Sequence, residues 1–172
     1  MKRFFAVAKG WENKGINLPT RQTKYSAGYD IEAAEDIEIP SIWSFLFDMN
    51  IVFDVKKQVE KLFKPIIVHT GVKVSMYEDE VFVVHVRSSM GIKHHLKLAN
   101  GTGIIDSDYY NNPNNDGEIM IALHNYGLTT KRIAKGERIA QGVFMKYYTV
   151  SDEQNLKERL GGIGSTGNLA LA

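Results

Sequence analysis

The stretch DEVFVVHVRSS, residues 79–89, indicates the fold most clearly. Its valines and its phenylalanine are typical of a β-strand, and the polar residues Arg87, Ser88 and Ser89 stand at its end. Other stretches with strand character are punctuated by glycine or proline: residues 2–10, 29–40, 65–76, 94–101, 118–127 and 137–150. Many short strands at regular spacing predict an all-β barrel or sandwich.

The composition fits one such domain. The chain has 172 residues, 44% of them hydrophobic, and a formal net charge of +1, which gives no electrostatic signal for nucleic acid or an anionic membrane. It contains no cysteine, so disulfides, thiolate zinc sites and cysteine nucleophiles are excluded. No apolar run has membrane-spanning length and the start does not resemble a secretory leader, so we expect a cytoplasmic protein.

Two segments depart from the strand pattern. Residues 42–63 carry apolar side chains at helical spacing, and a helix over roughly residues 48–63 is expected to end just before Pro65. This insertion is expected to pack onto the β domain, and a partner-binding surface is the alternative. Residues 151–172 are polar and then rich in glycine, which predicts a flexible C-terminal arm whose backbone amides could also close over phosphates.

Three polar residues at the end of the strongest strand form the first candidate site. The Arg87 guanidinium is a planar fork of donors, and the adjacent hydroxyls of Ser88 and Ser89 could complete a cradle for phosphate. A surface ion pair followed by a serine turn is the simpler interpretation.

A carboxylate in LANGTGIIDSDYYNN, residues 98–112, is the second candidate. Asp106 follows Ile104 and Ile105, so it is expected to be half-buried at the end of a glycine-punctuated hairpin. Such a group can act as a general base toward water, or it can be a turn aspartate that hydrogen-bonds its own backbone. In a continuous strand, Asp108 would share a face with Asp106.

A metal signal is weak. Asp30 lies near Glu32, Glu35 and Asp36, so a site for a hard cation is conceivable, but the spacing fits no EF-hand loop. The histidines do not form a paired zinc motif.

Five stretches in order resemble the motifs of the trimeric dUTPase family: AGYDIEAAED, RSSMGIK, NGTGIIDSDYYNN, KGERIAQ and GGIGSTG. They span nearly the whole chain, from Ala27 to Gly167. The resemblance implies a jelly-roll-like, distorted β-barrel over residues 1–150, with residues 151–172 as an arm that completes a neighbouring subunit's active site. It also implies a homotrimer that hydrolyses dUTP to dUMP and pyrophosphate with Mg²⁺.

The resemblance also implies a role for each matching residue. Asp106 would activate the water that attacks the α-phosphorus, and Asp30 would act on metal-bound water in the outer shell. Tyr109 would lie against the deoxyribose and exclude a 2′-hydroxyl, and Met120 would be a further substrate contact. Uracil would be read by the hairpin that contains Asn100, Gly103, Ile104 and Ile105. The phosphates and the closing arm would involve Arg87, Ser88, Ser89, Gln141, Arg159, Ile163, Gly164 and Ser165.

The chain departs from the family pattern in three places. In the last motif, Glu158 occupies the usual arginine position with Arg159 one place along, and Ile163 replaces a phenylalanine that stacks on uracil. YNNPNND, residues 110–116, reads as an enlarged loop. The third departure is the insertion at residues 42–63.

Two alternatives remain open. A deaminase of the related dCTP deaminase branch would need a glutamate acid-base, whereas this chain has Asp106 in that motif. A regulatory nucleotide-switch protein would bind a partner protein through the insertion at residues 42–63.

Overall fold

The computed structural model describes residues 2–44, 60 and 63–152, and this part of the chain is built mainly of short strands. The predicted helix at residues 48–63 and the predicted arm lie almost wholly outside these residues. The strands are β1 (Phe4–Val7), β2 (Tyr29–Glu32), β3 (Ile37–Ile39), β4 (Ile66–His69), β5 (Val72–Ser75), β6 (Glu80–Val86), β7 (Leu96–Leu98), β8 (Gly103–Asp106), β9 (Met120–Asn125), β10 (Lys131–Ile133) and β11 (Arg138–Lys146). The all-β prediction is confirmed.

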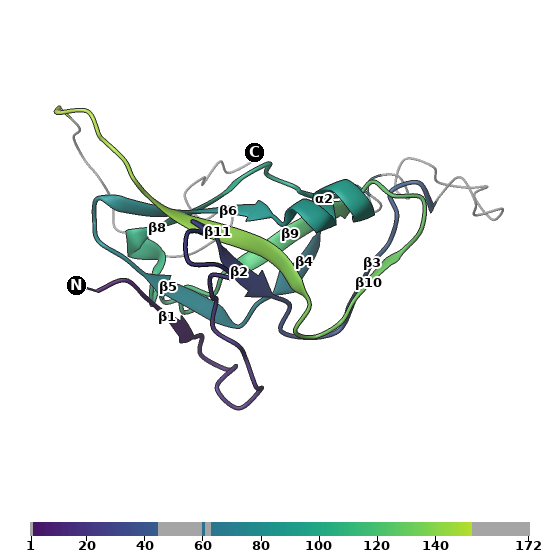
Figure 1. Ribbon diagram of the computed structural model, residues 1–172, viewed down its shortest axis with the longest axis horizontal. Coiled ribbons are helices and arrows are strands. Elements are labelled where there is room, and N and C mark those ends of the chain that lie inside the picture. Colours follow the sequence, from purple (N-terminus) through teal and green to yellow (C-terminus); the bar gives the residue numbers. More distant parts are fainter. Residues whose placement is uncertain (1, 45–59, 61–62, 153–172) are drawn as a thin grey trace, which may run out of the picture.

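Two sheets enclose the core. One has the strand order β2-β11-β6-β8 and the other the order β4-β9-β7, while β1 pairs with β5 and β3 with β10 in separate ribbons (Figure 1). Ile31, Phe82 and Ile139 of the first sheet belong to the same buried cluster as Val68 and Leu123 of the second. Because each strand alternates inward and outward side chains, the first sheet keeps a second face directed away from this core.

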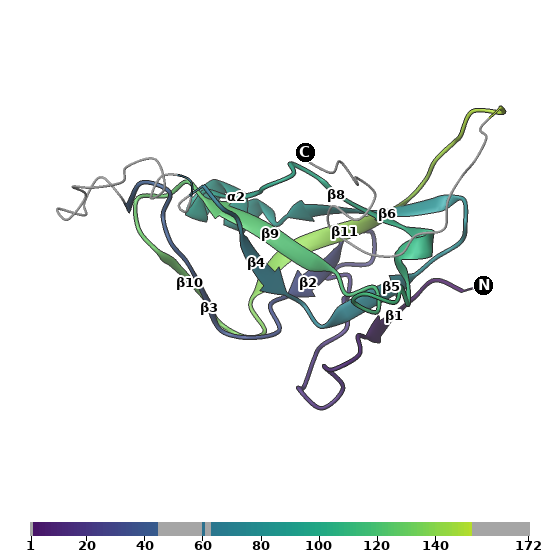
Figure 2. The same cartoon turned by 180° about the vertical axis from the view of Figure 1, so that it is seen from behind.

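The β3–β10 ribbon lies at one end of the molecule in both views (Figures 1 and 2). Next to it, the first residues of the predicted insertion pack against the body of the protein. Ile42 is buried, and its N–H donates to the Asn125 carbonyl oxygen at 3.0 Å. The Trp43 indole N–H donates to the Tyr126 carbonyl oxygen at 3.1 Å. The start of the insertion is therefore fixed to the end of β9.

Three local features differ from the sequence-based expectations. The short helix α2 (Ser88–His94) occupies the stretch after β6, where no helix was predicted. The predicted hairpin is wrong in its pairing, because β7 pairs with β9 and β8 pairs with β6. Asp108 lies in the 3₁₀ helix η2 (Ser107–Tyr109) and not in a strand, so the expectation of a strand face shared with Asp106 is also wrong. The chain thus passes from one sheet to the other between residues 98 and 103.

No helix within the described residues has both the length and the apolar character needed to cross a membrane.

Candidate active site

The outer face of the four-stranded sheet carries several of the predicted polar residues. Gln141 of β11 is paired with Asp30 of β2 on one side and with His85 of β6 on the other. Directly opposed residues of antiparallel strands project to the same face, so these three side chains form one polar row. Arg87 comes two residues after His85, where β6 has just ended.

Asp30 lies between two arginines. Its side chain is 9% exposed, and its oxygens lie 3.0 Å from the Arg87 Nε and 3.2 Å from the Arg138 Nη1. Two guanidinium groups and one carboxylate leave one net positive charge, and Arg138 remains 40% exposed. This cluster suits an anionic ligand, because a guanidinium group that is already partly paired can still donate hydrogen bonds to a phosphate oxygen.

Arg138 was not singled out from the sequence. It is 108 residues from Asp30 along the chain, and strand pairing alone brings β11 beside β2. The available signal was its position in KGERIAQ, the stretch that also contains Gln141. A β-bulge between Arg138 and Ala140 shifts the register of β11 against β2 at this point.

The backbone fixes the residues on both sides of this cluster. The Arg87 N–H donates to the Ile139 carbonyl oxygen at 3.1 Å, which ties the end of β6 to β11. Ser88 and Ser89 then begin α2, with Ser88 exposed and Ser89 partly exposed. At Gly28, an added Cβ would lie 2.6 Å from the Gln141 Oε1, so any larger residue would require this amide to shift.

A protein-built metal cage is not found in residues 2–44, 60 and 63–152, since no group of three or more histidine, aspartate or glutamate side chains there could hold a metal ion. Both carboxylate oxygens of Asp30 already face guanidinium groups. A Mg²⁺ ion beside these residues would therefore take most of its ligands from phosphates and water, a mode of binding that this ion commonly adopts.

Asp106 lies at the end of β8. It is partly buried and extended, with φ −79° and ψ 159°, and it directly precedes η2. Before it, Ile105 packs against the core while Ile104 is 57% exposed. Gly103 lies against β6, where an added Cβ would be 3.2 Å from the Val84 Cβ. Asn100 is exposed in the turn that leads into β8.

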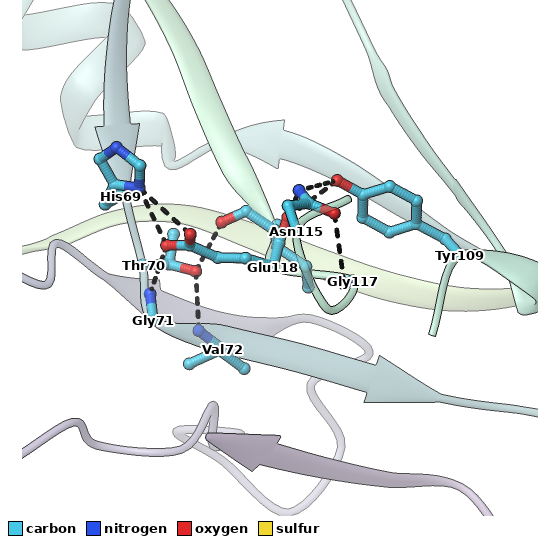
Figure 3. A network of polar contacts seen from close by, with 9 residues as sticks. His69, Thr70, Gly71, Val72, Tyr109, Asn115, Gly117 and Glu118 are labelled. Atoms are coloured by element: carbon cyan, nitrogen blue, oxygen red, sulfur yellow. Dashed lines mark hydrogen bonds and ion pairs between the residues drawn. The ribbon is translucent and has the colours of Figure 1, made fainter. Parts of the chain in front are cut away.

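Tyr109 belongs to the polar network drawn in Figure 3. Tyr109 is 6% exposed, and its hydroxyl donates to the Glu118 carbonyl oxygen at 3.0 Å. Met120 begins β9, where it is paired with His69 and partly exposed. The predicted sugar-contacting ring is thus held within a polar network and does not lie on an open surface.

Asp106 and the Asp30 cluster are far apart within one chain. Asp106 pairs with Val81, four residues before His85 on β6, and Asp30 is two strands further across the sheet. Three strand spacings of about 4.8 Å and four residues of about 3.3 Å give a separation of roughly 20 Å. A triphosphate is much shorter, so one chain does not bring both groups to the same nucleotide.

Arg159, Ile163, Gly164 and Ser165 lie outside the described residues, so their predicted roles stay predictions.

Known proteins now identify the family. The dUTPase family model matches residues 46–167 of the chain. A deoxyuridine 5′-triphosphate nucleotidohydrolase of Lactococcus lactis is 39% identical over 167 residues, which are 96% of this chain and 97% of that protein. The chain belongs to the dUTPase family. The recognition from ordered motifs is confirmed.

Solved dUTPase structures share the fold. The dUTPase of Streptococcus mutans is 34% identical, with a TM-score of 0.69 over 86% of this chain and 98% of that one. A dUTPase mutant from phage phi11 of S. aureus is 20% identical, has a TM-score of 0.63 and covers 91% of this chain and 98% of its own; its structure is described as showing coordination of a structural Mg(II) ion. The second likeness concerns the fold alone. The jelly-roll-like fold of the dUTPases is confirmed, while the described strands form separate sheets and not one closed barrel.

Proposed function

We propose that this protein hydrolyses dUTP to dUMP and pyrophosphate in the presence of Mg²⁺. The observation that carries the proposal is the 39% identity, over nearly the full length of both chains, to a relative named deoxyuridine 5′-triphosphate nucleotidohydrolase. The positively charged cluster around Asp30 and the partly buried Asp106 provide the two kinds of group that this reaction needs.

Asp106 acts as the general base. Its carboxylate accepts a proton from a water molecule, which attacks the α-phosphorus in line with the departing pyrophosphate. Arg87, Ser88, Ser89 and Gln141 bind the phosphates, and Arg159 reaches the terminal phosphate from the arm. Because proton transfer is the task of a single side chain, removing the Asp106 charge affects the rate more than the binding of dUTP.

The segment from Asn100 to Ile105 reads uracil, and Tyr109 and Met120 contact the rest of the nucleoside. Gly103 and Ile104 belong to this segment. Backbone amides can pair with the uracil edge, and close packing leaves no room for a 5-methyl group. In the arm, Ile163, Gly164 and Ser165 close over the bound nucleotide.

Mg²⁺ neutralises charge on the triphosphate when it is bound. The phosphates and water would supply most of its ligands, and Asp30 would hold the ion in place through water in the outer shell. This role fits the position of Asp30, whose carboxylate is oriented by Arg87 and Arg138.

We further propose a cytoplasmic homotrimer. The roughly 20 Å between Asp106 and the Asp30 cluster supports active sites that take these groups from different subunits, with residues 151–172 reaching a neighbour. Partner binding through residues 42–63 is a further proposed property, and it is separate from catalysis. Neither nucleic acid nor a membrane has a place in this proposal.

The test measures pyrophosphate release from dUTP, dCTP, TTP and UTP with Mg²⁺. We expect selective hydrolysis of dUTP, and a fall of at least about a hundredfold in kcat for Asp106→Asn with dUTP binding retained. Ammonia release from dCTP would instead identify a deaminase. Tight binding of dUTP without turnover would favour the regulatory nucleotide switch.

A further inference from the structure

The enlarged loop after Tyr109 is ordered around an asparagine. The Asn115 Nδ2 donates to the Tyr109 hydroxyl oxygen at 2.7 Å and to the Glu118 carbonyl oxygen at 3.3 Å. The Tyr109 hydroxyl in turn donates to the same Glu118 carbonyl oxygen at 3.0 Å. Figure 3 shows the Asn115 amide directed at the end of the tyrosine ring. The Asn115 amide and the Glu118 carbonyl therefore hold the hydroxyl from two sides.

The acceptor side of the Asn115 amide is also engaged. Its Oδ1 accepts from the Asn112 Nδ2 at 2.7 Å and from the Gly117 N–H at 3.3 Å. Both donors and both acceptor positions of the amide are thus used. Asn112, which is 5% exposed, also donates from its Nδ2 to the Tyr109 carbonyl oxygen at 2.9 Å. The network consequently fixes Tyr109 at its backbone and at its hydroxyl.

The loop is anchored to the body of the protein. The Lys73 Nζ of β5 lies 2.6 Å from both the Asn111 Oδ1 and the Asp116 Oδ2. Asn111, Asp116 and Gly117 have φ angles of 58°, 59° and 81°, and a Cβ on Gly117 would lie 2.6 Å from the Tyr109 carbonyl oxygen. Three residues with positive φ restrict the conformations open to this loop, and they place Asn115 beside the Tyr109 hydroxyl.

We propose that Asn115 is a positioning residue that holds the Tyr109 ring as a rigid wall against the sugar and thereby sets the preference for dUTP over UTP. This inference rests on the proposed function, in which Tyr109 faces the deoxyribose. An apolar pocket alone discriminates weakly against a substrate with an added hydroxyl. Steric exclusion of that hydroxyl therefore requires that the side chain facing the sugar cannot move aside. With 6% of its surface exposed, Tyr109 has little freedom once its hydroxyl is held.

The experiment compares kcat/KM for dUTP and UTP in the wild type, Asn115→Ala, Tyr109→Phe and the double variant. Asn115→Ala is expected to lower the ratio of the two kcat/KM values by about five- to tenfold, the amount associated with one lost hydrogen bond. The change should come mainly from better use of UTP and a higher KM for dUTP. The kcat for dUTP should stay within about twofold, because Asp106 is untouched.

Two comparisons separate positioning from general destabilisation. The ratio is measured for both substrates on one enzyme sample, so the fraction of folded enzyme cancels. Tyr109→Phe removes the contact with Asn115 and also the hydroxyl's bond to the Glu118 carbonyl, so it should lower the ratio at least as far. The double variant should show no loss beyond that of Tyr109→Phe, because the hydroxyl that Asn115 contacts is already absent. Asn114→Ala is the matched control: this side chain is exposed and makes no hydrogen bond with the described residues, so the wild-type ratio is expected.

The possible results separate the positioning role of Asn115 from the proposed dUTP hydrolysis. Selective dUTP hydrolysis in the wild type, with an unchanged ratio in Asn115→Ala, would overturn the positioning role and leave the proposed function standing. A wild type that does not hydrolyse dUTP would overturn both. A lower ratio in Asn115→Ala and a normal ratio in Asn114→Ala would support the inference.

Discussion

Asp30 forms two ion pairs in the structure and is also one of the proposed site residues. Its carboxylate is nearly buried and lies between the guanidinium groups of Arg87 and Arg138. If the carboxylate were removed, two like charges would face each other across a partly desolvated site, which is costly in a way that an exposed pair is not. The same carboxylate orients Arg87 toward its proposed phosphate ligand.

Asp30→Asn should therefore lower the free energy of unfolding by about 2 kcal/mol, less than the loss of a fully buried pair because both arginines are partly exposed. Urea denaturation of the variant and the wild type measures this difference. Glu38→Gln is the matched control, since Glu38 and Arg132 form an ion pair with side chains 59% and 85% exposed, and a change within about 0.5 kcal/mol is expected. Equal effects of the two substitutions would contradict the account.

The sequence singled out candidate site residues but not the residues that contact them. Arg87 and Gln141 were singled out because each lies in a short local motif. In the structure Gln141 is paired with His85 of β6, and Arg87 directly follows the end of that strand. The contact of Arg138 with Asp30 could not be predicted, because it depends on how β11 pairs with β2. Likewise, Tyr109 was recognised from its motif, whereas its hydrogen bond with Asn115 requires the turn geometry of a loop that the sequence marked only as enlarged.

Strand β6 was predicted clearly because its valine-rich pattern agrees with its burial, whereas α2 was missed. That helix has only seven residues and contains Gly91 and Ile92, so local propensity favours it weakly. Its start is fixed by the Arg87 N–H, which donates to the Ile139 carbonyl oxygen. Tertiary hydrogen bonding thus decides a conformation that the local sequence leaves open. The prediction of a hairpin was wrong for the same reason, because β7 and β8 pair with strands of two different sheets and not with each other.

An ion pair between Arg3, which directly precedes β1, and Glu80 holds the beginning of β1 beside the start of β6. The Arg3 Nε lies 2.9 Å and 2.7 Å from the two Glu80 oxygens, and Arg3 Nη2 also donates to Glu80. The pKa of the Glu80 carboxyl lies below its ordinary value of 4.5, chiefly because of the hydrogen bonds from Arg3, which outweigh the opposing effect of burial.

Because the folded-state pKa is lowered, Glu80 stabilises the fold above pH 4.5, and this stabilisation is lost as the pH falls below that value. Glu80→Gln should accordingly be less stable than the wild type at pH 7, and the gap between their urea midpoints should narrow below pH 4.5. Glu38→Gln serves as control, since Glu38 and Arg132 form an ion pair whose side chains are 59% and 85% exposed. A gap that stays constant down to pH 3 would assign the effect to packing and not to charge.

The outer face of the four-stranded sheet carries a row of apolar side chains. Beside the polar row, Ile104, Val83 and Val143 are paired across β8, β6 and β11, and Met145 follows on the same face with 52% of its surface exposed. Adjacent exposed apolar side chains typically mark an interaction surface. The same face carries Asp106 and the Asp30 cluster, which lie roughly 20 Å apart within one chain. If this face were buried between subunits, Asp106 of one subunit could lie beside the Asp30 cluster of another. The same contact would cover the apolar row.

Met145→Glu tests this arrangement. A buried, unpaired carboxylate costs several kcal/mol, and threefold symmetry would repeat that cost at each interface. Light scattering should therefore show a trimer for the wild type and mostly monomers for the variant, with loss of dUTP hydrolysis although Asp106 and Arg87 are unchanged. Leu128→Glu, at a 71% exposed apolar residue after β9, should remain trimeric and active. A Met145→Glu protein that stays trimeric and active would place the interface elsewhere, and an active wild-type monomer would show that one chain suffices.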